Sequence, residues 1–197
     1  MRTRLPLLVL MLIVAAPGWA AATYEECQAT VEVFREFSNT SEFLANAYGY
    51  AVFPTIGKGG LGIGGAYGTG CVYLGGVKAG TVSMGQVTVG FQLGGQVYSE
   101  LIVFQHKGAY DSFTSGSFEF GADATAVALT YGAQAGTGTT GSSASAGTSA
   151  GNTRGVGGAY RGMALFTLAK GGLMYEASVG GQKFNFQPIG LEQSSAY

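Results

Sequence analysis

Glycine alternates with apolar and aromatic residues over residues 49–132 and 155–181, and this spacing constrains the fold more than any other feature. The run Gly60-Leu61-Gly62-Ile63-Gly64 is typical. Because successive strand residues point to opposite faces of a sheet, such a run puts branched side chains on one face and almost nothing on the other. Glycine weakens a strand through its conformational entropy, so 35 glycines in 197 residues indicate a bare face that a backbone, a helix or a ligand approaches closely.

This alternation predicts many short strands separated by glycine turns, a pattern typical of an antiparallel sheet that curls. The expected fold is mainly β, within the α+β class: a strongly curved antiparallel sheet or barrel-like sandwich with an N-terminal helix packed on it. The expected strands are residues 50–54, 60–67, 71–74, 82–93, 97–105, 117–120, 124–131, 158–168, 173–179 and 183–186.

Residues 24–48 have helical spacing instead, because their apolar residues recur every three or four positions. A break near residues 38–41 divides the segment, and Thr40 or Ser41 is expected to cap a second short helix. The opposite face is rich in glutamate, which favours a helix packed on the sheet over a membrane-surface helix with a basic face. One further helical turn is expected over residues 107–113.

The N-terminus is typical of a secretory signal peptide over residues 1–22: a start containing Arg2 and Arg4, a short apolar run, and small residues at 20–22. The expected product is exported, periplasmic or extracellular, and associated at most peripherally with a membrane. The remaining residues 23–197 suffice for one domain. Within it, residues 133–153 are almost entirely Gly, Ala, Ser and Thr, a composition that predicts a flexible loop.

Charge excludes one class of partner. Losing Arg2 and Arg4 leaves the eleven acidic residues in excess over the basic ones, whereas nucleic-acid binding needs a basic face. Charged residues make up only 11% of the chain. Such a low charge is typical of a compact domain that sits against lipid or another protein.

Two cysteines follow the expected cleavage site, Cys27 and Cys71. In an oxidising compartment they form one disulfide if their Cα atoms come close enough. The alternative is two small buried hydrophobic side chains. The sequence leaves both open.

No motif predicts catalysis, a metal site or a cofactor. His106 is the single histidine and lacks a partnering nucleophile motif, so a strand-end role is preferred to that of a general base. Residues 57–62 have the spacing G-x-G-x-x-G, but more glycine follows where a dinucleotide site needs a helix. Nothing in the spacing of the central carboxylates requires them to face one another. These are Glu100, Asp111, Glu119 and Asp123.

Several ordered segments resemble the SYLF domain, also described as the YSC84-like actin-binding domain. Residues 47–54 (AYGYAVFP) and 57–60 (GKGG) are similar to its opening strand and turn, and residues 116–124 (GSFEFGADA) to its G-x-F-x-x-G-A-D-A signature. Residues 64–70, 90–96, 100–104 and 170–181 agree in the same order. The similarity covers most of residues 23–197.

The resemblance implies a lipid-binding, non-enzymatic module of the family's exported bacterial branch. Eukaryotic members bind phosphoinositide membranes, and some bind actin. Two departures matter here: residues 24–43 are acidic where those relatives carry a basic amphipathic segment, and the loop at 133–153 replaces a short G-P-x-G-R connection, leaving Arg154 as its counterpart. Recognition of a multiply phosphorylated headgroup is therefore not expected, nor is actin binding by an exported protein.

The sequence thus predicts that acyl chains or a phospholipid bind in an apolar groove near the glycine-faced strands. Lys58 and Lys78 are the expected headgroup contacts, with Arg154 a further candidate. A solvated turn is the alternative for both lysines, because lysine is usually exposed. Two other functions remain open: a protein-interaction or envelope-structural domain, which includes a homo-oligomer, and a small outer-membrane barrel, although several expected strands look too short for that.

Overall fold

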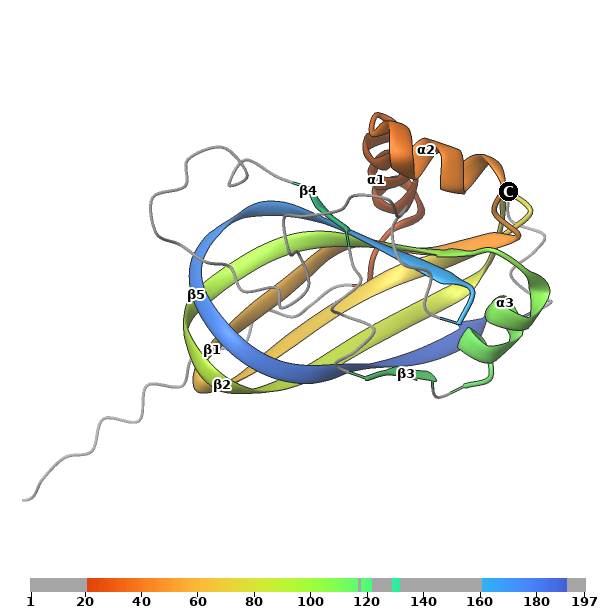
Figure 1. Ribbon diagram of the computed structural model, residues 1–197. Helices are drawn as coiled ribbons and strands as arrows, with labels where there is room; N and C mark the ends of the chain where they lie inside the picture. Colours follow the sequence, from red (N-terminus) through yellow and green to blue (C-terminus); the bar gives the residue numbers. More distant parts are fainter. Residues whose placement is uncertain (1–20, 117, 122–128, 132–160, 191–197) are drawn as a thin grey trace, which may run out of the picture.

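The computed structural model of the protein describes residues 21–116, 118–121, 129–131 and 161–190 (Figure 1). The expected signal peptide, apart from its last two residues, lies outside the described residues, as do the loop at 133–153 and Arg154. The elements are α1 (Tyr24–Arg35), α2 (Ser38–Ala45), β1 (Gly49–Leu74), β2 (Val77–Phe104), α3 (Lys107–Phe113), β3 (Phe118–Phe120), β4 (Leu129–Tyr131) and β5 (Met163–Pro188). No described helix is long and apolar enough to cross a membrane.

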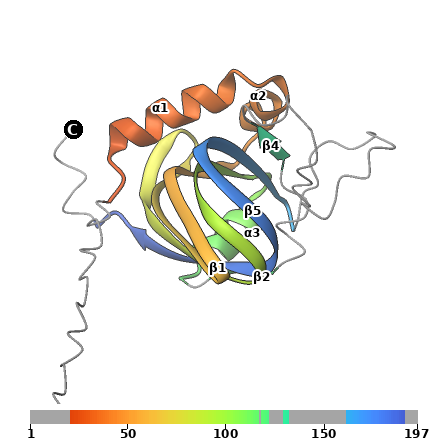
Figure 2. The same ribbon diagram turned by 90° about the vertical axis from the view of Figure 1, so that its left-hand side faces the viewer.

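All strands belong to one sheet of order β1-β2-β5-β3, in which β1, β2 and β5 are long and antiparallel. The two short strands pair with the outer edge of β5, β3 in the antiparallel and β4 in the parallel direction. The sheet is strongly curved, as the end view shows (Figure 2), and the described strands do not close it into a barrel. The expected mainly β fold with N-terminal helices packed on a curved antiparallel sheet is confirmed.

The expected short strands are wrong in one respect: most are parts of three strands of 26 to 28 residues. Residues 50–54, 60–67 and 71–74 all lie in β1, where a register shift after Phe53 replaces the first expected turn and pairing with β2 runs unbroken through the second, at residues 68–70; a further register shift follows Leu61. A bulge bends a strand without ending its pairing. The one tight turn between β1 and β2 is at Gly75 and Gly76, which both have positive φ.

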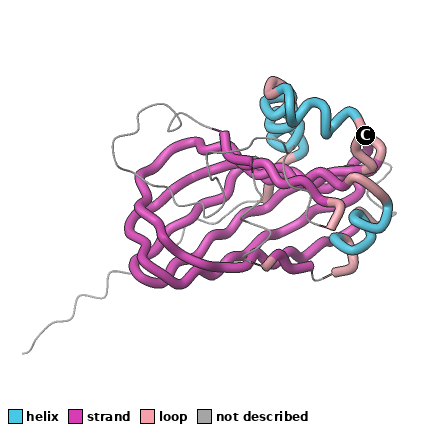
Figure 3. Tube along the Cα trace, in the orientation of Figure 1, coloured by secondary structure: helices cyan, strands magenta, loops and turns pink. Residues whose placement is uncertain are grey.

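Each long strand bends in its middle, so the sheet folds back on itself as two facing layers (Figure 3). We call residues 49–56 the first arm of β1, residues 57–65 its bend and residues 66–74 its second arm. A Cβ added to Gly70 of the second arm would clash with the carbonyl oxygen of Val52 in the first arm. The surface that approaches this bare glycine is therefore the other half of the same strand.

Two hydrophobic cores result, one on each face of the sheet. The inner core fills the space between the layers, where the rings of Phe53 and Phe184 lie 5.7 Å apart, and α3 contributes Ala109 and Phe113 at the end away from the bend (Figure 1). The outer core lies between the sheet and the N-terminal helices. It contains Cys27, Val31, Phe34, Leu44, Tyr50, Val52, Cys71, Tyr73, Leu101, Val103, Ala164 and Phe166.

Helix α1 starts with a capping box in which the Thr23 hydroxyl accepts from the Glu26 amide and the Glu26 carboxylate accepts from the Thr23 amide. Its buried residues recur every three or four positions, and the structure joins Cys27 to Cys71 of β1 by a disulfide with a Cα separation of 6.2 Å. The expected cap of the second helix is wrong: α2 starts at Ser38, and its N-cap residue makes no side-chain cap.

Candidate binding surface at the bend of the sheet

The outer face of the sheet is apolar and exposed around the bend. Exposure ranges from 78% for Leu61 to 38% for Val97. Cross-strand pairing makes these side chains neighbours, because Leu61 lies opposite Leu93 and Ile63 opposite Val89. We call this set the apolar band: Leu61, Ile63, Tyr67, Val87, Val89, Leu93 and Val97.

Glycine makes this bend. Between the pairs Leu61 with Leu93 and Ile63 with Val89, the single residue Gly62 of β1 faces three residues of β2. Gly62, Gly90 and Gly94 have φ of 75°, 149° and 119°, a region that favours glycine. The glycines therefore allow the sheet to turn sharply while the alternating apolar side chains stay on its outer face.

Charge is almost absent from this part of the hairpin. In residues 57–70 and 83–98 the only charged residue is Lys58. The N-terminal helices cover the other end of the sheet and leave the bend open (Figure 1). Among the described residues, the apolar band is consequently a patch of large hydrophobic side chains with neither a helix over it nor a charged side chain in it.

The inner face near the bend is polar instead. Gln86, Thr88, Glu100 and Gln182 are all buried there. Nε2 of Gln182 donates to Oε2 of Glu100 over 2.9 Å, while Oε1 of Glu100 and Oε1 of Gln182 have no hydrogen-bond partner. Burial raises the pKa of Glu100 from an ordinary 4.5 to about 7, although the hydrogen bond from Gln182 and the charge of Lys58 both act to lower it.

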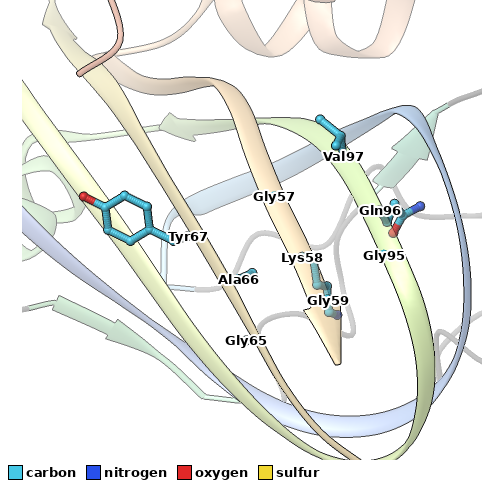
Figure 4. A pocket seen from close by; sticks show the side chains of 9 residues that line it. All are labelled: Gly57, Lys58, Gly59, Gly65, Ala66, Tyr67, Gly95, Gln96 and Val97. Atoms are coloured by element: carbon cyan, nitrogen blue, oxygen red, sulfur yellow. The ribbon is translucent and has the colours of Figure 1, made fainter. Parts of the chain in front are cut away.

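A pocket of about 590 Å³ lies where the two arms of β1 separate (Figure 4). Lys58 is the one charged residue of its lining, which also has four glycines and a mixture of polar and apolar side chains. The lining residues are Gly57, Lys58, Gly59, Gly65, Ala66, Tyr67, Gly95, Gln96 and Val97. Because Tyr67 and Val97 also belong to the apolar band, the pocket and the band adjoin.

The two lysines expected to contact a headgroup lie in different parts of the fold. Lys58 is half-buried within β1, opposite Gln96, and lines the pocket. Lys78 lies beside the turn between β1 and β2, with its Nζ 6.0 Å from the ring centroid of Tyr24 in α1. Lys78 therefore lies away from the pocket, its contact with a headgroup stays a prediction, and Arg154 lies outside the described residues.

The remaining chemical candidates have local structural roles. His106 is the N-cap of α3, where its Nδ1 accepts from the amide of Ala109 over 3.2 Å. Asp111 pairs with Lys107 at the surface, and Glu119 is exposed on β3. Across the described ranges, no three His, Cys, Asp or Glu side chains are grouped as metal ligands would be.

Sequence reasoning missed the buried polar residues of the inner face. A signal exists, because Gln86 and Thr88 alternate with Val87 and Val89, but only the register shows which set points inward. It also missed the role of Pro54 at the first bulge of β1. The carbonyl oxygen of Pro54 accepts from Oγ of Ser99 and Nζ of Lys170 over 2.7 and 2.6 Å, which ties the three long strands together.

One comparison with known proteins gives a match. The model of the Ysc84 family, described as "Las17-binding protein actin regulator", matches residues 85–186. This range begins in β2 and ends in β5, so it includes both Glu100 and Gln182. The chain matches no curated protein and no solved structure.

Proposed function

This chain belongs to the Ysc84, or SYLF, family, and from that premise we propose that it is a lipid-binding module that contacts lipid through the bend of its sheet. The family domain is of a binding type and is associated with lipid or actin. The proposed ligand is a phospholipid. Its acyl region lies on the apolar band, and its headgroup lies at the pocket beside Lys58.

The observation that carries this proposal is the exposure of the apolar band. Burying a Leu, Ile or Val side chain contributes roughly 1.5–3 kcal/mol. Contiguous exposed apolar patches mark protein or membrane contact sites, whereas single exposed residues do not. The cross-strand pairs of Leu61 with Leu93 and Ile63 with Val89 make this a contiguous patch.

The composition of the bend favours lipid over a protein partner. Protein interfaces combine an apolar centre with a polar rim, and their strongest contacts come from Trp, Tyr and Arg. Residues 57–70 and 83–98 contain neither Trp nor Arg, Tyr67 is their one exposed tyrosine, and Lys58 is their only charge. That charge is an ammonium at the edge of an apolar surface, which suits a ligand with an anionic head and apolar tails.

Export is part of the proposal, because residues 1–22 have the sequence pattern of a signal peptide. An exported module of this kind acts on a lipid surface outside the cytoplasm. Mass spectrometry of the secreted or periplasmic protein tests this point. A mature chain that starts near residue 23 supports export, and an uncleaved chain in the cytoplasm contradicts it.

Vesicle co-sedimentation tests the lipid contact. We expect the wild type to bind vesicles, and the double variant Leu61→Ser, Val89→Ser to bind at least tenfold more weakly. Val77→Ser is the matched control, because Val77 is 72% exposed yet lies at the turn between β1 and β2, outside the band. Co-sedimentation with filamentous actin is measured in parallel, because the family description names actin regulation.

Three outcomes would contradict the proposal. One is equal loss of binding in the band variant and in Val77→Ser. Another is binding to actin without binding to vesicles. The third is a wild type that binds no vesicle and carries no lipid detectable by mass spectrometry.

A further inference from the structure

The hydrogen bond between Glu100 and Gln182 joins the two layers of the folded sheet. Glu100 of β2 lies opposite Phe53, in the layer of the first arm of β1. Gln182 of β5 lies opposite Gln86, which pairs with Ala66 in the second arm. The contact therefore crosses the interior between the inner core and the bend.

The two side-chain oxygens of this pair that lack a hydrogen-bond partner could be joined by a single proton between them. Oε1 of Glu100 and Oε1 of Gln182 are both buried, and neither has a hydrogen-bond partner. A carboxylate and an amide carbonyl can only accept hydrogen bonds, and leaving buried acceptors unpaired costs about 1–3 kcal/mol each. A proton on Oε1 of Glu100 would be the missing donor, since a protonated carboxyl can donate to the Gln182 carbonyl while still accepting from its amide group.

We infer that Glu100 and Gln182 form a proton-dependent clasp between the layers, and that opening it withdraws Lys58 from an anionic ligand in the adjoining pocket. In the closed clasp, Glu100 is a neutral acid with two hydrogen bonds to Gln182. When its proton passes to solvent, the carboxylate takes the ammonium of Lys58 as its partner. The second half of this inference rests on the proposed lipid function, whereas the clasp itself does not.

The surroundings of Glu100 support this exchange. Among the described residues, the charged or titratable side chains facing this interior are Lys58 of β1 and Tyr98 of β2, while β5 presents Gln182 and β3 presents Phe118 and Phe120. Lys58 is thus the only cation that faces Glu100 in the described part of the chain. With a pKa of about 7, the carboxyl changes its charge near neutral pH.

The test measures binding to vesicles of phosphatidylglycerol and phosphatidylcholine at pH 5.5 and 8.5, between which the lipid charge is constant. We expect the wild type to bind at least threefold more tightly at pH 5.5. Glu100→Gln retains both hydrogen bonds of the clasp at every pH, because its amide can donate permanently. We therefore expect this variant to bind at pH 8.5 as tightly as at pH 5.5.

Two further variants make the test specific. Glu119→Gln removes an exposed carboxylate of β3 and should keep the pH dependence of the wild type. Lys58→Gln should bind anionic vesicles more weakly and lose the pH dependence. A Glu100→Gln variant that keeps the wild-type pH dependence would overturn the inference, and so would a Glu119→Gln variant that loses it.

Urea unfolding over the same pH range tests the clasp without lipid. The unfolding midpoint of the wild type should fall as pH rises towards 7, and that of Glu100→Gln should stay level. If no variant binds vesicles but these midpoints behave as expected, the lipid function fails and the clasp stands. A level wild-type profile overturns the clasp, whatever the vesicles show.

Discussion

The two ends of the folded sheet are built in opposite ways. At the end under α1 and α2, both faces are covered, and aromatic side chains fill the inner and the outer core. At the bend the outer face is apolar and exposed, while the inner face carries Gln86, Thr88 and Glu100. The same three strands therefore have a conventional interior at one end and a reversed pattern at the other.

This difference separates folding from function along a single hairpin. Buried aromatic residues stabilise the covered end, and mutations there should act on the free energy of unfolding. The bend buries little apolar surface on its outer face, so its large hydrophobic side chains have no evident part in folding. Their exposure is the reason to assign them to a ligand.

The largest expected effect concerns the inner core. Phe184 is fully buried against Phe53, Phe113 and Phe120, so Phe184→Ala should lower the free energy of unfolding by about 3–5 kcal/mol. Leu93→Ala at the bend should change it by less than about 0.5 kcal/mol, because Leu93 is already 58% exposed. Urea denaturation measures both. Equal losses would remove the distinction between the two ends.

Next in size is the link between the helical layer and the sheet. The disulfide joins Cys27 to Cys71, which are separated by 44 positions in the sequence, and so closes a long loop. Replacing both cysteines by serine should lower stability by about 2–4 kcal/mol. Thermal unfolding with and without reductant checks this, since reductant should affect the wild type only. Vesicle binding at the distant bend should persist at temperatures where the variant stays folded.

The pH dependence of stability tests the polar interior. Glu100 has a pKa of about 7 in the folded protein against an ordinary value of 4.5, so between these values the folded state holds a proton that the unfolded state has released. Raising pH through this window favours unfolding, and the contribution of Glu100, complete below pH 4.5, falls by about 3 kcal/mol by pH 7. Urea midpoints should show this decline for the wild type. A rise in stability across the window would contradict the assignment.

The smallest expected effects come from two glycines in the same hairpin. Gly70→Ala places a Cβ against the carbonyl of Val52 where the layers touch, and should cost about 1–3 kcal/mol. Gly85→Ala meets nothing within 4 Å and should stabilise the protein by about 0.5 kcal/mol. Comparing the urea midpoints of the two variants shows whether glycine is needed because another backbone segment approaches it closely or whether it only adds flexibility to the chain. A neutral Gly70→Ala would mean that the layers do not need this contact.

Local periodicity explains what the sequence could predict. The helical spacing of Cys27, Val31 and Phe34 marks both α1 and its buried face, and the glycine alternation marks strands. Neither pattern distinguishes a turn from a bend, because glycine permits both. The approach of Gly70 to Val52 depends on strand pairing across the whole hairpin, which no local pattern encodes.

The site was less accessible to sequence reasoning for the same reason. Lys58 stands out as a lone cation among glycines, and it does line the pocket. Lys78 looks equivalent in sequence, yet the fold places it beside Tyr24 and α1. Glu100 and Gln182 are 82 residues apart, so their pairing appears only once the sheet folds into two layers.

The most direct test of the central claim asks which surface enters lipid. An environment-sensitive fluorophore is attached to Leu93→Cys in the apolar band or, in a separate protein, to Val77→Cys at the far turn, with the native disulfide left oxidised. On addition of phosphatidylglycerol vesicles, the probe at position 93 should shift to the blue and the probe at position 77 should not. A blue shift at position 77 with none at position 93 would show that the bend is not the lipid-binding surface.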